Sequence, residues 1–287
     1  EREPQPMRLR SIAATALISG LLVALTATSP ATAASFTDPP TVEEVPAGAI
    51  TSLPAGTKQS CSTPTNPSGS TCAVLNWAGL RYWFLSKTDN SWGWHVAVSG
   101  KDGARLGDEY LGGNARYVRS VVVDTAGQQV RVTGQDNIYA DISFAALASI
   151  VPENSLDTHL ALSVPIAPIA DHPSSVEVTA DLDTPSLDPG GQIIVETADH
   201  TEIGRSDVPA DYTGGAIPIP VDLSSLEIGG NEITARYAPP VRSPLKASSS
   251  ADKNLQVLKT YLVSFFDPEG AFIADERVVS GEAATAP

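Results

Sequence analysis

The sequence predicts an all-β protein made of small antiparallel domains in series. Two observations indicate this class. Apolar and polar residues alternate with period two over short segments, as in Trp92, Trp94, Val96 and Val98. Turn-forming clusters separate these segments, and the chain contains 22 Gly and 23 Pro. One segment, SFAALASIV at 143–151, is too short for periodicity to decide between a helix and a strand.

The N-terminus has the three parts of a secretory signal peptide. Met7 is followed by Arg8 and Arg10, then by an apolar run at 12–27, and small residues lead to Ala33. We expect residues 1–33 to be this signal, with extra residues before Met7 and cleavage after Ala33. A membrane anchor is the weaker alternative, because the run contains polar residues and no stop-transfer charges follow it.

Charge and hydropathy limit the partners. The formal net charge is −15, and an acidic surface repels phosphate backbones, so we expect no nucleic-acid binding. No second apolar run reaches the roughly 20 residues of a membrane span, so we expect no membrane contact after signal cleavage.

Cys61 and Cys72 are the two cysteines, and in an exported chain they predict one disulfide. The bridge closes a Pro-, Gly-, Ser- and Thr-rich loop, and loop entropy gives it about 3 kcal/mol. Their spacing does not fit a zinc site.

The domain organisation follows from the turn signals. After the signal peptide we expect a Pro/Ser/Thr-rich leader with the disulfide loop at 34–73, an aromatic-rich antiparallel β module at 74–135, a linker at 136–172, a β-sandwich at 173–258 and a further hairpin at 259–287. The prolines of IPIPV at 217–221 indicate an edge strand.

All four tryptophans, Trp77, Trp83, Trp92 and Trp94, lie in the first module. Most share their phase with aliphatic neighbours, which predicts a packed core. In RYWFLS the phase is ambiguous, so one face of that strand remains a candidate aromatic platform for sugar stacking. Tyr82 and Trp83 are therefore the tentative ligand-binding residues.

No residue pattern indicates catalysis. The four histidines are scattered, and HExxH, GxSxG and phosphate-loop motifs are absent, so we assign no catalytic residue and no cofactor. Asp171-His172 lies in a Pro-rich segment, where a solvated histidine is the simpler interpretation. Asp89-Asn90, Asp102 and Asp136-Asn137 are candidate calcium-binding loops, but the DxDxDG spacing is missing and we assign no metal ligand.

The segment at 173–258 resembles bacterial immunoglobulin-like domains of surface and secreted proteins. Its closing strand fits the family pattern L-x-x-G-x-x-x-I-T-A-x-Y, on Leu226, Gly229 or Gly230, Ile233, Thr234, Ala235 and Tyr237. The resemblance implies an immunoglobulin-like β-sandwich. The Cys…Trp…Cys pattern of antibody domains is absent.

Two shorter resemblances flank this segment. The residues Val263, Phe265, Asp267, Gly270, Val279, Gly281, Ala284 and Pro287 resemble the start of a Listeria–Bacteroides-type repeat, which implies a partial, truncated β-grasp repeat. Tyr82-Trp83, Thr88-Asp89-Asn90, Ala115-Arg116-Tyr117 and Val132-Thr133-Gly134-Gln135 are similar to a small repeat of exported Gram-positive proteins.

These observations favour a non-catalytic exported protein of a bacterial cell surface with a structural or adhesive role. Candidate partners are a cell-wall or extracellular glycan or a protein, and the expected location is secreted or cell-wall associated. The alternatives are a carbohydrate-binding accessory region of a larger exported enzyme and a small secreted hydrolase.

Overall fold

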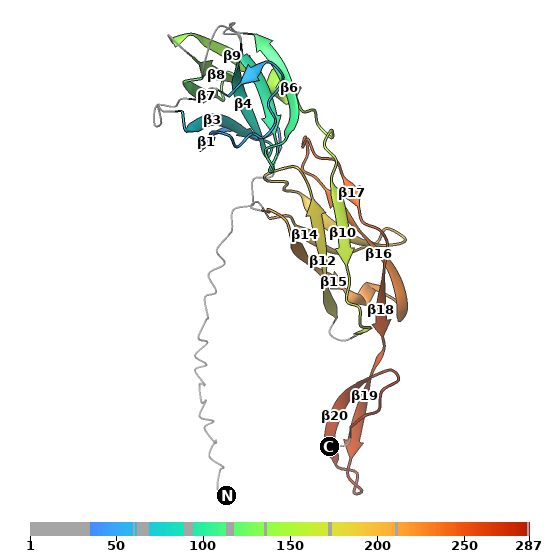
Figure 1. The fold of residues 1–287 in the computed structure, drawn as a ribbon. Helices are drawn as coiled ribbons and strands as arrows, with labels where there is room; N and C mark the ends of the chain where they lie inside the picture. Colours follow the sequence, from blue (N-terminus) through green and yellow to red (C-terminus); the bar gives the residue numbers. More distant parts are fainter. Residues whose placement is uncertain are drawn as a thin grey trace, which may run out of the picture. The chain divides into compact units, whose positions relative to one another are not determined.

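The computed structural model describes residues 35–59, 61, 69–88, 94–112, 118–134, 137–171, 174–209, 212–285 and 287. Strands form nearly all of its regular structure, so the all-β class is confirmed (Figure 1). The expected signal peptide at 1–33 lies outside the described residues. Within the described part of the chain, no helix is long and apolar enough to cross a membrane.

The first β unit contains two antiparallel sheets. One has the order β1-β3-β4-β5-β6, with β2 paired to β4, and the other is β7-β8-β9. The strands are β1 Thr41–Pro46, β2 Thr57–Lys58, β3 Thr71–Trp77, β4 Leu80–Lys87, β5 Trp94–Ser99, β6 Arg105–Gly112, β7 Ser120–Asp124, β8 Gln129–Thr133 and β9 Tyr139–Ser143.

The turn between β3 and β4 has only two residues, Ala78 and Gly79, because Trp77 pairs directly with Leu80. Both turn residues have positive φ, 52° and 70°. A two-residue hairpin needs this geometry to match the twist of its strands. The turn thereby fixes the register that places β4 at the centre of the unit.

The segment at 136–172, expected as a linker, contains regular structure at 139–148, 159–163 and 169–170. β9 pairs with β8, and the ambiguous segment at 143–151 contains the short helix α1, Phe144–Ala148, capped by Ser143. Phe144 and Leu147 are buried in the core of the first unit. Tertiary burial therefore gave structure to a segment whose local sequence carried only a weak signal.

The second β unit is one continuous sheet in the order β10-β12-β15-β14-β13-β16-β18-β11, with β17 beside β16, and it encloses an apolar core. Its elements are β10 His159–Ser163, β11 Ile169–Ala170, β12 Ser175–Asp183, β13 Gln192–Thr197, β14 Glu202–Asp207, β15 Ala216–Asp222, the 3-10 helix η2 Leu223–Ser225, β16 Gly229–Ala238, β17 Ser248–Ser249 and β18 Lys253–Leu258.

The prolines of β15 occupy a place where a missing N–H is tolerated. β15 pairs with β12 along its whole length, but it meets β14 at a single residue pair, Gly204 with Val221. Pro218 and Pro220 are exposed and alternate with buried Ile217, Ile219 and Val221. One side of this strand therefore behaves as an edge.

The last two strands, β19 Thr260–Phe266 and β20 Phe272–Val279, form a separate two-stranded antiparallel sheet within the segment where we expected a hairpin. Figure 1 shows them as one hairpin. Among the described residues, no third strand pairs with either of them.

Candidate functional site

The two tentative ligand-binding residues are buried. Tyr82 is 0% exposed and Trp83 is 1% exposed, although they point to opposite faces of β4. Neither ring can stack on a sugar from solvent. The expected aromatic platform therefore has no exposed ring at Tyr82 or Trp83.

Apolar cover on both sides of β4 explains this result. Tyr82 packs in the larger core cluster, between the two sheets of the first unit, and burial raises the pKa of its hydroxyl. Trp83 packs in a second cluster with Val45 and Ile50, and its Nε1 donates to Ser99 Oγ at 2.9 Å. Most strands of antiparallel sheets in small domains have one solvent-exposed face, so the sequence alone could not indicate that both faces of β4 are buried.

The other aromatic predictions are confirmed where the structure describes them. Trp77 and Trp94 are buried, and the Trp77 ring lies 4.8 Å from Phe36 and 5.4 Å from Phe144 between centroids. Trp77 Nε1 donates to the carbonyl of Asp38 at 2.7 Å. Trp92 lies outside the described residues.

The predicted disulfide between Cys61 and Cys72 is present, with Cα atoms 4.8 Å apart. Cys72 is buried in the same cluster as Trp83, while Cys61 lies at its margin. The bridge ties the expected leader to β3 and so belongs to the first unit.

One histidine–carboxylate pair lies on the first unit. His95 Nε2 on β5 is 2.8 Å from Asp108 Oδ2 on β6, and Arg105 binds the second oxygen of the same carboxylate at 3.1 Å. In the described part of the chain, no serine, threonine or cysteine is hydrogen-bonded to this histidine. The three groups form a cross-strand ion-pair network and lack the nucleophile that a hydrolytic relay needs.

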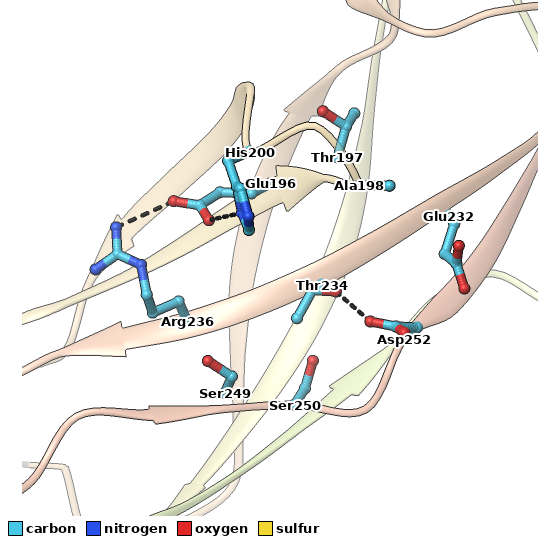
Figure 2. A pocket seen from close by; sticks show the side chains of 10 residues that line it. All are labelled: Glu196, Thr197, Ala198, His200, Glu232, Thr234, Arg236, Ser249, Ser250 and Asp252. Carbon is cyan, nitrogen blue, oxygen red and sulfur yellow. Dashed lines mark hydrogen bonds and ion pairs between the residues drawn. The ribbon is translucent and has the colours of Figure 1, made fainter.

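One surface hollow lies on the outer face of the second unit and has a volume of about 660 Å³ (Figure 2). Alternating residues of β16, Glu232, Thr234 and Arg236, form its floor, because Ile233, Ala235 and Tyr237 between them point into the core. β13 contributes Glu196, the turn after it contributes His200, and Asp252 precedes β18.

Ion pairs hold one side of this hollow. Glu196 lies opposite Thr234 in the strand register, and its carboxylate is 3.0 Å from the Arg236 guanidinium and 3.7 Å from His200 Nδ1. The Glu196 side chain is only 17% exposed, so the guanidinium balances a charge that has lost much of its water.

The other side offers groups with spare hydrogen-bonding capacity. The Asp252 carboxylate accepts from the Thr234 hydroxyl at 2.5 Å, and exposed Glu232 lies beside it (Figure 2). Ser249 adds a hydroxyl, whereas the buried Ser250 hydroxyl already donates to the Ala251 carbonyl and accepts from the Ala235 N–H. This arrangement can receive hydrogen bonds and positive charge from a ligand, and its lining contains no tryptophan, tyrosine or phenylalanine.

The turn that carries His200 is held locally. The Asp199 carboxylate accepts from the Thr197 hydroxyl and from the Thr201 backbone N–H, and these bonds lower the pKa of Asp199. His200 has a positive φ of 65°, which is uncommon for a residue other than glycine.

No metal centre was found among the described residues, since no three histidine, cysteine or acidic side chains converge there. The Asp102 carboxylate accepts from the backbone N–H of Ala104 at 3.0 Å, so it stabilises its own turn. Asp89, Asn90, Asp136 and His172 lie outside the described residues.

Sequence reasoning missed the hollow. Its residues come from β13, β16, β17 and two loops, and no spacing motif connects them. The available signal was the run Glu232, Thr234 and Arg236 on one face of a strand, which by itself describes any solvated strand.

No protein-family model matches the chain, and a search of the curated proteins also found no match.

Proposed function

We propose that this chain is a non-catalytic exported module of a bacterial cell surface that makes a protein contact through the hollow on β13 and β16. The disulfide supports an oxidising, extracytoplasmic location. The resemblances to a bacterial immunoglobulin-like domain at 173–258 and to a β-grasp repeat at 259–287 belong to this proposal.

One observation carries the proposal. The Glu196 side chain is only 17% exposed and is held by Arg236 at 3.0 Å, whereas Glu232 and Asp252 face the same hollow from exposed positions. A fixed polar floor beside exposed carboxylates suits a partner that presents lysine or arginine side chains.

A glycan is less well supported than a protein. The alternative of a carbohydrate-binding accessory region relied on exposure of Tyr82 or Trp83, and both are buried. The hollow itself is lined by no tryptophan, tyrosine or phenylalanine that could stack on a sugar ring.

The test compares two doubly charge-reversed variants that change net charge equally. Glu232→Lys/Asp252→Lys alters the hollow, and Glu177→Lys/Glu109→Lys alters exposed carboxylates on β12 and β6. Each folded variant is applied to immobilised extracellular proteins, cell-wall sacculi and a glycan array.

We expect the wild type to bind a protein, the hollow variant to lose at least about tenfold in affinity, and the control to keep it. Equal binding by both variants would contradict the assignment of the hollow. Binding to glycans alone would favour the accessory-region alternative.

A further inference from the structure

The outer face of β4 is covered by residues 48–59, here called the strap. Trp83 on this face is 1% exposed, and Ala97 beside it on β5 is 0% exposed. Ile50 and Leu53 of the strap pack against the same cluster. Because the other face of β4 packs in the larger core, the strap forms part of the cover that separates Trp83 from solvent.

The strap is held to the sheet by short stretches of backbone pairing. β2, Thr57–Lys58, pairs with β4 at two positions, and Thr51 N donates to the Gly103 carbonyl at 3.0 Å. By contrast, β1 pairs with β3 at six positions. Segments with few backbone bonds and few apolar contacts open at lower free energy than the sheet that they cover. We therefore expect the strap to open before the sheet unfolds.

Both ends of the strap are fixed at Cys72. On the β1 side, Val45 lies opposite Cys72 in the strand register. On the other side, the disulfide joins Cys61 to Cys72. Gln59 connects the two ends, because its Oε1 accepts from Gly48 N at 2.9 Å and its Nε2 donates to Cys72 Sγ at 3.5 Å. The disulfide thus closes the strap into a loop that begins and ends at one residue.

We infer that the Cys61–Cys72 disulfide latches the strap, and that its reduction opens the strap over Trp83 and Ala97 while the sheet stays folded. A dithiol supplies the two electrons and two protons. The S–S bond breaks, both cysteines become thiols, and the dithiol is oxidised to its own disulfide. After reduction, Cys61 keeps its isolated β-bridge to Val118, which is a single backbone contact.

Loop entropy sets the size of the effect. While the disulfide is intact, an opened strap must still return to Cys72. Closing a loop of this length lowers the opening equilibrium by roughly a hundredfold. The bridge to Val118 keeps part of this restraint, so we expect reduction to favour the open strap by at least about tenfold.

This inference goes beyond the proposed function, because the strap lies on the first β unit and shares no residue with the hollow on β13 and β16. The latch makes burial of the aromatic face conditional on the oxidising location that the disulfide supports.

The test places one reporter thiol under the strap and a matched one in the opposite core. Ala97→Cys lies under the strap, and Val96→Cys, one residue earlier on β5, faces the larger core; both positions are 0% exposed. Each substitution is made in the full chain with the disulfide intact and in the Cys61→Ala/Cys72→Ala background. The rate of reaction with a thiol-specific reagent is measured in native buffer. Circular dichroism checks that each variant folds, and mass spectrometry checks that the disulfide is intact.

Removing the disulfide should speed the labelling of Ala97→Cys by at least about tenfold. In the background without the disulfide, Ala97→Cys should also react at least about tenfold faster than Val96→Cys. Equal rates for the two reporters would mean that the face opens only when the whole unit unfolds, and would overturn the inference. An unchanged rate for Ala97→Cys would show that the disulfide does not latch the strap.

Hydrogen exchange reads the same opening in the unsubstituted chain. The Thr51 amide, bonded to Gly103, reports on the strap, and the amides of β5 report on the sheet. With a dithiol present, exchange at Thr51 should become at least about tenfold faster and depend little on added urea, because opening the strap exposes little surface. The β5 amides should keep a steep dependence on urea. An equally steep dependence at Thr51 would refute a separate opening of the strap.

Discussion

Replacing Trp83 by alanine should destabilise the first β unit strongly. The side chain is 1% exposed and packs with Val45, Ile50 and Leu85, and its Nε1 donates to a fully buried Ser99 hydroxyl. Truncating a buried tryptophan costs about 3–5 kcal/mol. The orphaned Ser99 hydroxyl adds about 1 kcal/mol or more.

Urea unfolding measures this loss of stability. Circular dichroism is the signal to follow, because the substitution removes one tryptophan and so changes the fluorescence of the chain. Trp83→Phe keeps most of the ring and loses the N–H, so we expect an intermediate cost of about 1–2 kcal/mol. Tyr110→Ala removes a half-exposed aromatic side chain of the same unit and should cost less than about 1 kcal/mol.

If the Trp83 ring is part of the core, Trp83→Ala must not unfold at nearly the same urea concentration as Tyr110→Ala. Unfolding at the same concentration would mean that Trp83 is accessible in solution, and the aromatic platform would return as a candidate site.

Three further predictions concern the disulfide and two buried polar groups. Cys61→Ala/Cys72→Ala should lower the free energy of unfolding by about 3 kcal/mol, because the bridge joins two residues with a sequence separation of 11. Reductant acting on the wild type should reproduce this loss of stability. An unchanged urea midpoint would contradict the prediction. Tyr237→Phe should cost about 1–3 kcal/mol in the same assay, because the buried hydroxyl donates to the carbonyl of Pro189 at 3.0 Å; an unchanged midpoint would show that water satisfies this carbonyl. Burial raises the pKa of Asp188 to about 6 in the folded state, above its unfolded value. The contribution of Asp188 to the free energy of unfolding is therefore most favourable at low pH and is lost as the pH rises through 6. Asp188→Asn should gain stability relative to the wild type between pH 4.5 and 7.5, and a stability difference that does not depend on pH would contradict the pKa shift.

Strand positions could be predicted from the sequence where one face of the strand is exposed to solvent, because polar and apolar residues then alternate. β16 and β15 alternate buried and exposed residues along their length, so period two in the sequence identified them. β4 has no such alternation in burial, because apolar clusters cover both faces. The sequence therefore located the strand but could not assign an exposed aromatic face to it.

The candidate site was not predictable for a different reason. Glu196 and Arg236 are far apart in the chain and meet because β13 pairs with β16 in one particular register. Each charge alone resembles any surface charge. Their pairing forms one side of the hollow, and the exposed carboxylates of Glu232 and Asp252 lie on the other.

The sequence by itself determined the all-β class, the disulfide and the hairpin of β19 and β20, because alternation, cysteine count and turn residues are local signals. The tertiary structure alone decided that 139–148 belongs to a core, that Tyr82 and Trp83 are buried on opposite faces, and that a polar hollow lies over β13 and β16. Those outcomes depend on which distant segments cover each face, and that information is carried by packing between segments rather than within them.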